Sequence, residues 1–298
     1  MTTRQTIEIA DPHLHVWQLR AGHYHWLRAE QPPLWPDKAL LQQDHLPKTL
    51  QLKAPFHVAG VVAIEAGFDN NQPERELHWL SEQSWPCAWR SVAFLDCAAP
   101  LADIENKLAA LLPYQPVGVR HIFEGQDERL LHSAQLDTIA GWLEQHQLLL
   151  EVQCDLSNAA NAKRIWQLAE RYPDLRLVLN HAGLVQPDNY SAWQLQLSQL
   201  AYYSNIAMKL SGWEMLHAGK QSRFDVNWLQ QVLDTTLQQV PAQQLMLASN
   251  FPLCLWQGSY QQLWQHYFDT CQQLGLSSSD WQQLSRLSAG YWYSLASR

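Results

Sequence analysis

Basic side chains are few in this sequence, in which 20 Lys and Arg stand against 28 Asp and Glu, and the formal net charge is -8. A surface that binds nucleic acid needs clustered cations to neutralise phosphates. Long apolar runs are also missing, and none approaches the roughly 18 residues that a membrane span requires. We therefore expect a small-molecule partner and neither a nucleic acid nor a membrane. A homo-oligomer remains open.

Paired cysteines and a secretion signal are absent as well. The five cysteines are odd in number and scattered, without the CxxC spacing of a zinc or dithiol site. The opening residues, MTTRQTIEIADPH, lack the apolar stretch of a signal peptide. The sequence thus predicts reduced, mostly buried cysteines and a cytoplasmic location.

What the sequence does contain is enough apolar material for one large core, since 47% of its 298 residues are hydrophobic and 16% are charged. Short β-rich runs alternate with segments whose apolar residues have helical spacing. This alternation predicts parallel strands joined by helical crossovers. No linker or repeat divides the chain, so we expect residues 1–298 to form a single domain. The predicted strands are Thr6–Ala10, Val58–Ile64, Arg90–Leu95, Val117–His121, Leu148–Val152, Leu175–Leu179, Ile206–Leu210 and Leu245–Ala248.

An open doubly wound sheet would alternate in the same way, but it usually carries a Gly-rich phosphate turn after its first strand. Residues 11–15, DPHLH, take that place here. Together with the number of strands, this favours an α/β fold of the (β/α)8 TIM-barrel class.

Two segments outside the strands also carry expectations. The first crossover, from Trp17 to about Pro55, is long and proline-rich, and we expect it to lie over the barrel mouth, where it could cover substrate. The tail Asp280–Ala296 has helical spacing of apolar and aromatic residues. We expect this tail to pack on the outside of the barrel.

His13 and His15 are two residues apart at the end of the first predicted strand. If the strand continues through them, both side chains point to the same side of the pleat. Two such imidazoles can hold a divalent metal such as zinc, or polarise a carbonyl without one. The pair alone is as often incidental, but its position favours function because barrel active sites are built at the C-terminal ends of strands.

Two later strands also end in polar residues. Residues 177–183, LVLNHAG, place His181 at a strand end, and residues 245–252, LMLASNFP, do the same for Asn250. We expect both side chains to share one cavity with His13 and His15. For His181 the alternative is a structural histidine held by a backbone carbonyl.

Five ordered motifs carry a resemblance to a known family. They are HLHVW at 13–17, GVRH at 118–121, NHAG at 180–183, KLSG at 209–212 and ASNFP at 248–252. In this order they resemble the amidohydrolase-2 branch of the amidohydrolase superfamily, and within it the sugar-lactone hydrolases. The likeness covers nearly the whole chain.

The resemblance implies a hydrolase that opens a small sugar-acid lactone by attack of water on the carbonyl carbon. It also implies that His13, His15 and His181 bind a metal or polarise the carbonyl, and that Arg120 steadies the substrate. A structural ion pair is the alternative for Arg120.

Four further residues are candidates for substrate contact. His121 follows Arg120, and Glu65 ends the second predicted strand, where a loop-anchoring ion pair is the alternative. Trp17 and Trp213 could offer flat apolar faces to a sugar, with core packing as the alternative.

Asn250 departs from the family pattern, which has an Asp at this position. An amide can neither take a proton from water nor give a metal a charged ligand. The sequence therefore predicts substoichiometric zinc or none, and a general base elsewhere, at His181, His121 or Glu65. It also predicts that Asn250→Asp raises activity. The competing functions are a related decarboxylase or hydratase, and a catalytically weakened barrel that binds a sugar acid or an assembly partner.

Overall fold

The computed structural model describes residues 6–35, 37–217 and 224–295. Eight parallel strands form one sheet in the order β1 to β8, which confirms the predicted (β/α)8 TIM-barrel class. The strands are β1 Ile7–Leu14, β2 Phe56–Ile64, β3 Ala88–Phe94, β4 Gly118–Ile122, β5 Leu149–Gln153, β6 Leu177–Leu179, β7 Ile206–Leu210 and β8 Leu245–Leu247.

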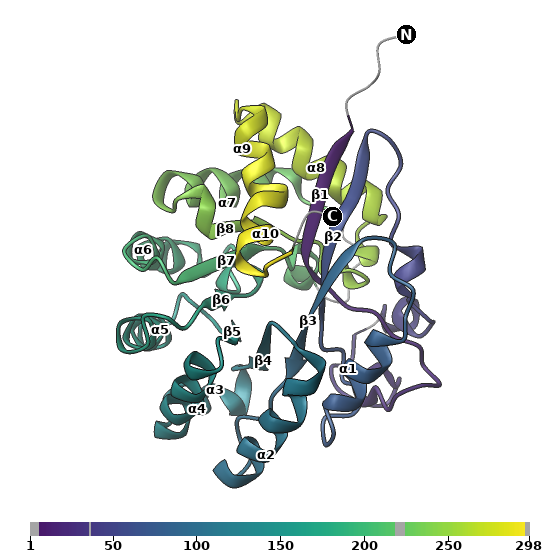
Figure 1. Ribbon diagram of the computed structural model, residues 1–298. Coiled ribbons are helices and arrows are strands. Elements are labelled where there is room, and N and C mark those ends of the chain that lie inside the picture. The colour runs from purple at the N-terminus through teal and green to yellow at the C-terminus, as the bar shows by residue number, and fades with distance from the viewer. Residues whose placement is uncertain (1–5, 36, 218–223, 296–298) are drawn as a thin grey trace.

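Helices follow the strands and lie outside them, as Figure 1 shows most clearly for α4, α5 and α6. No helix among the described residues is long and apolar enough to cross a membrane. The helices between the strands and after β8 are α1 Glu74–Ser81, α2 Leu101–Leu111, α3 Glu128–Leu131, α4 Ala134–Gln145, α5 Ala159–Arg171, α6 Tyr190–Leu200, α7 Val226–Gln239 and α8 Tyr260–Gln273.

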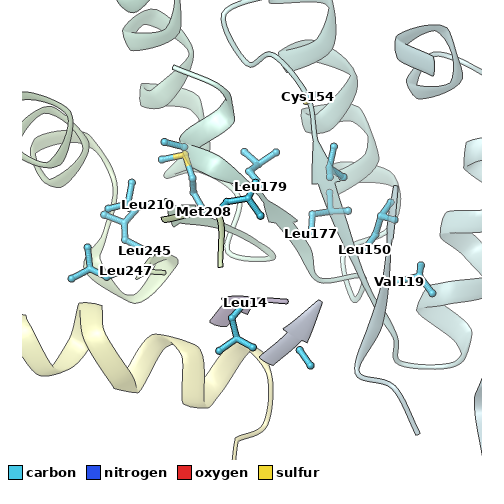
Figure 2. Packing of buried hydrophobic residues seen from close by; sticks show 14 of the residues in the cluster. Leu14, Val119, Leu150, Cys154, Leu177, Leu179, Met208, Leu210, Leu245 and Leu247 are labelled. Carbon is cyan, nitrogen blue, oxygen red and sulfur yellow. The ribbon is translucent and has the colours of Figure 1, made fainter. Parts of the chain in front are cut away.

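Alternation along the strands separates two hydrophobic clusters, because successive side chains point to opposite faces. The larger cluster lies between the strands and the helices, and Figure 2 shows Leu177, Leu179, Met208 and Leu210 of this cluster on β6 and β7. The smaller cluster fills the barrel interior, with residues such as Val62. Charged side chains that occupy interior positions of the strands are therefore unusual and mark the site described below.

The C-terminal tail packs on the outside of the barrel, as expected, at Trp281 and Leu284, but its last residues enter the barrel interior. It forms α9 Ser278–Gln282, a π-helical turn Gln283–Leu287 and α10 Ser288–Trp292. Trp292 and Tyr293 belong to the interior cluster, and the Tyr293 hydroxyl donates to Glu151 on β5 at 2.7 Å. Trp292 and Tyr293 thus complete the inner core, where apolar surface from the strands is available to cover them.

The first and last strands are joined by the segment that follows β8. The backbone N–H of Asn250 donates to the carbonyl of His13 at 2.9 Å, and the N–H of His15 donates to the carbonyl of Phe251 at 2.7 Å. Strand β1 extends to Leu14, beyond the predicted end at Ala10, and so carries His13 into this junction. Barrel closure therefore places His13 beside Asn250, which is 237 residues away along the chain.

Candidate active site

A cavity of about 550 Å³ opens at the C-terminal ends of the strands. The long first crossover contributes Trp26, Pro33 and Trp35 to its wall, in agreement with the position expected for that segment. The remaining lining residues are His15, Glu65, Ala66, Gly67, Asn70, Phe94, Arg120, Ile122, Glu124, Gln153, His181, Leu184, Gln186, Met215, Asn250 and Leu253.

Three histidines gather at the floor of this cavity. The ring of His13 lies 5.1 Å from that of His15 and 4.6 Å from that of His181, measured between centroids. His15 and His181 line the cavity, whereas His13 is fully buried and lies beneath them. The structure thus brings together the three histidines chosen from the sequence, with His13 one layer deeper.

The buried Lys209 sets the protonation of His13. Lys209 Nζ lies 3.1 Å from His13 Nδ1 and 2.7 Å from Glu151 Oε1, and all three side chains are fully buried. Burial lowers the pKa of Lys209 to about 8, and Glu151 opposes that shift, so Lys209 remains an ammonium group at neutral pH. An ammonium group only donates. His13 therefore accepts at Nδ1 and carries its proton on Nε2, which has no partner among the described residues.

His15 has the opposite tautomer. Its Nδ1 lies 2.9 Å from the carbonyl oxygen of Glu65 and 3.2 Å from that of Ile64. Because carbonyl oxygens only accept, Nδ1 of His15 carries the proton and its Nε2 keeps a lone pair.

His181 is held by the segment that follows β7. Its Nδ1 lies 3.0 Å from the Ser211 hydroxyl oxygen. Gly212, with φ +83°, passes so close that an added Cβ would lie 2.8 Å from the Cβ of His181. A glycine is required there for both reasons, its left-handed φ and the close approach of the ring.

All three imidazoles are neutral at physiological pH. Burial is the main cause, and it lowers the pKa of His13 and of His181 well below the ordinary value. Lys209 adds to the effect on His13, and Arg120 adds to it on His181. Burial, followed by the charge of Arg120, lowers the pKa of His15 to about 3. The floor of the cavity is therefore a set of uncharged donors and acceptors.

Arg120 is held by its neighbours on the cavity wall. It forms a buried ion pair with Glu65, and its NH2 group donates to Gln153 Oε1 at 2.5 Å. Gln153 in turn donates to Glu124 at 2.5 Å. Arg120 Nε has no partner among the described residues. The ion pair that was the alternative to substrate contact for Arg120 and Glu65 is present. Both residues nevertheless line the cavity.

Asn250 lines the cavity and contacts a carboxylate that the sequence did not reveal. Its Nδ2 donates to Glu214 Oε1 at 2.5 Å, and both side chains are buried. Glu214 belongs to the short turn Trp213–His217 after β7. Burial raises the pKa of Glu214 to about 7.

The donor set does not fit a tightly held divalent metal. A metal would need a lone pair on His13 Nε2, where the contact with Lys209 places a proton. The anionic ligand expected on strand β8 is an amide, and Arg120 and Lys209 add positive charge. Within residues 6–35, 37–217 and 224–295, no group of three or more His, Cys, Asp or Glu side chains has the arrangement of a metal site. We therefore assign no metal to His13, His15 and His181.

Two candidates for substrate contact lie outside the cavity. His121 follows Arg120 on β4 and so points to the opposite face of the strand, where its Nδ1 lies 2.9 Å from the carbonyl oxygen of Leu95. Trp17 is fully buried, with its ring against Trp26 and its Nε1 donating to the carbonyl of Gln43. The predictions of substrate contact by His121 and Trp17 are corrected, because core packing and these hydrogen bonds hold both side chains away from the cavity.

Trp213 has an intermediate position. It lines a small hollow of about 30 Å³ that adjoins the main cavity and shares His181 and Met215 with it, but Trp213 itself does not line the main cavity. Its Nε1 donates to the hydroxyl of Tyr267 at 2.7 Å, so the ring is fixed by the core.

Two site residues that the sequence analysis missed, Glu151 and Lys209, could have been recognised from the sequence. Glu151 and Lys209 are charged residues within predicted strands that are otherwise apolar, and parallel strands of a barrel are buried on both faces. Such residues must pair inside the barrel. Glu214 had no comparable signal, because it follows a strand end where polar residues are ordinary.

Comparison with known proteins agrees with this arrangement. The sequence profile of the amidohydrolase family matches residues 10–280. The chain belongs to the amidohydrolase family. Among curated proteins, this family member is 25% identical to an L-fucono-1,5-lactonase from Burkholderia multivorans over 270 residues, which cover 85% of each chain.

Solved structures share the fold. An amidohydrolase from Burkholderia multivorans, solved with bound zinc, matches with a TM-score of 0.76 at 22% identity over 97% of this chain and 100% of that one. A candidate 2-pyrone-4,6-dicarboxylic acid hydrolase from Pseudomonas putida matches with a TM-score of 0.66 at 19% identity over 96% of this chain and 97% of that one.

Proposed function

We propose that this amidohydrolase opens a neutral sugar-acid lactone by attack of water on the ring carbonyl. The observation that carries the proposal is the neutral histidine floor beneath a cavity whose described lining contains one arginine, Arg120. The name of the Burkholderia multivorans relative supports a sugar lactone as the substrate class.

The charge of the lining favours a neutral substrate. Arg120 is paired with Glu65, and Glu124 adds a second carboxylate to the wall. Among the described lining residues, no cation is left to compensate the charge of a dianionic lactone, and ionised groups need a partner when water is excluded. Asn70, Gln153 and Gln186 offer amides to hydroxyl groups, and Trp26 and Trp35 offer apolar ring faces.

The reaction needs a polarised carbonyl, a positioned water and a base. The unpaired Nε–H of Arg120 is suited to stabilise negative charge on the carbonyl oxygen. The oxygen of water bonds to the carbonyl carbon while its proton passes to His181. The ring C–O bond then breaks, the ring oxygen takes up a proton, and a hydroxy acid leaves.

We assign the base to His181 because its ring lines the cavity and stays unprotonated well below neutral pH. Glu65 is committed to Arg120, and His121 lies outside the cavity. A low pKa weakens a base, but a strained lactone is an activated ester that demands less of it.

The test is a panel of sugar-acid lactones, with a pyrone dicarboxylate lactone and a benzoic acid decarboxylation assay as comparators. We expect acid release from a neutral lactone. His181→Asn should lower kcat by about 10²- to 10⁴-fold. His121→Asn is the matched control and should leave kcat within a few-fold. Decarboxylation without lactone opening, or tight binding of a sugar acid without turnover, would replace the proposal with one of the competing functions.

A further inference from the structure

The strongest unexplained feature of the site is a carboxylate behind residue 250. Glu214 is buried and does not line the main cavity, and its carboxylate accepts from the Asn250 amide at 2.5 Å. Asn250 itself does line the cavity. Glu214 can therefore reach the reaction only through Asn250.

The contact decides which end of the Asn250 amide is left for the site. Nδ2 is bound to Glu214, and the backbone N–H is bound to the carbonyl of His13. No described group donates to Oδ1, which is buried. A buried acceptor without a partner is costly and is usually satisfied by water or ligand. The Asn250 side chain is thus held with Oδ1 able to accept a hydrogen bond from water or ligand.

Resting on the proposed lactone hydrolysis, we infer that Glu214 is a positioning residue that holds Asn250 with Oδ1 ready to accept a hydrogen bond from the attacking water or a substrate hydroxyl. The pair consists of one carboxylate and one amide. The carboxylate of Glu214 follows β7, and the amide of Asn250 follows β8. Because Glu214 already supplies the carboxylate, residue 250 is an amide in this chain.

The contact with Glu214 changes the expectation for Asn250→Asp. A second carboxylate at position 250 would face that of Glu214 across a hydrogen-bond distance. Two carboxylates in one buried site must share a proton. The single substitution should therefore not raise activity at neutral pH, whereas Glu214→Gln together with Asn250→Asp keeps one carboxylate and one amide.

Few other ionisable groups face Glu214. The Cys254 thiol and the Tyr267 hydroxyl are buried, which raises the pKa of each well above its ordinary value and keeps both neutral. His266 lines the same small hollow as Glu214. None of these three side chains hydrogen-bonds to the side chain of Asn250 among the described residues, although the backbone N–H of Cys254 donates to the Asn250 carbonyl at 3.3 Å.

The experiment is a double-mutant cycle in the full-length chain, with kcat, KM and urea unfolding measured from pH 5 to pH 9. Glu214→Leu should lower kcat by about 10- to 100-fold with KM within about 2-fold, because a misplaced group costs rate more than binding. Glu214→Gln should recover most of the loss, since its amide oxygen can still accept from Asn250. Asn250→Asp should be less active than the double variant by about 10-fold or more, and the gap should widen as pH rises.

Asn161 on α5 supplies the matched control. It is fully buried, and its Nδ2 donates to Glu128 at 2.8 Å, outside the cavity. Asn161→Asp should reduce stability as pH rises but leave kcat unchanged.

Two outcomes would overturn the inference. One is Glu214→Leu with unchanged kcat, and the other is Asn250→Asp with the same activity and stability curves as the double variant. If the wild-type protein opens no lactone, the proposed function fails. The unfolding curves of the single and double variants would then still show whether Glu214 holds residue 250.

Discussion

Lys209 on β7 donates to Nδ1 of His13 on β1 inside the barrel, at 3.1 Å, and so directs the proton of the imidazole to Nε2. The same ammonium group neutralises Glu151. One buried cation therefore both compensates a charge and selects a tautomer. The polar layer of this barrel is a connected unit of β1, β5 and β7.

Replacing Lys209 should destabilise the protein strongly. Lys209→Met leaves Glu151 buried without its cation, which costs about 3–5 kcal/mol of unfolding free energy. Lys209→Met with Glu151→Leu should recover much of that loss, because two apolar groups replace the pair. Urea denaturation measures both, and additive losses in the double variant would contradict the pairing.

The two tautomers can be observed directly. We expect ¹⁵N chemical shifts of neutral His13 with the proton on Nε2 and of neutral His15 with the proton on Nδ1. His15 should stay neutral as pH falls to about 4, because burial and Arg120 lower its pKa to about 3. Protonation of His15 near pH 6 would show that the site is more hydrated than the structure indicates.

Zinc should be bound weakly because Nε2 of His13 carries a proton and offers no lone pair to the metal. Protein purified without chelator should contain substoichiometric zinc by mass spectrometry, and dialysis against chelator should leave lactone hydrolysis unchanged. Lys209→Met should increase zinc retention if it folds, because His13 Nε2 is then free to present a lone pair. One tightly held ion per chain in the wild-type protein would refute the assignment of the tautomer.

Glu214 should make stability fall as pH rises. Burial raises its pKa from 4.5 to about 7 in the folded protein, so its neutral form is favoured there. The stabilising contribution is complete below pH 4.5 and is lost as pH rises through about 7. At roughly 1.4 kcal/mol per pKa unit, the loss is about 3 kcal/mol. Glu214→Gln should flatten the unfolding free energy over this range, and an unchanged slope would contradict the shift.

Gly212 should be essential for the position of His181. An added Cβ would lie 2.8 Å from the Cβ of His181, at a φ of +83°. Gly212→Ala should lower kcat by about 10- to 100-fold, because the ring must move. Gly275 has a φ of +73° with nothing within 4 Å of an added Cβ, so Gly275→Ala is the control. It should lose about 1–2 kcal/mol of stability from the left-handed backbone but keep its activity.

A pH–rate profile by itself would not separate His181 from Glu65 as the base. Burial lowers the pKa of His181 and raises that of Glu65, so the ordinary pKa values of the two residue types do not apply here. Substitution of each residue is therefore the decisive measurement. Tertiary environment has shifted both pKa values away from the ordinary values of the two residue types.

The barrel class and the ends of its strands could be predicted from the sequence alone. Alternating strand and helix patterns depend on local periodicity, and polar residues that end apolar strands are visible one strand at a time. His15, His181 and Asn250 were found in this way because parallel strands bring their C-terminal ends to one face, whereas Arg120 was indicated by the resemblance to the amidohydrolase-2 family. The same reasoning located Glu65 at that face.

Partnerships between side chains were decided only by the tertiary structure. His121 follows Arg120 and carries the same type of signal, yet the pleat turns it away from the cavity. The pairs of Lys209 with His13 and of Glu214 with Asn250 join residues from different strands and turns. No local pattern encodes such pairs, because they depend on barrel closure and on which side chains face one another inside it. Barrel closure and the exclusion of water decided which ring nitrogen of His13 and of His15 carries the proton. They also decided that Glu214 is the carboxylate that binds the Asn250 amide.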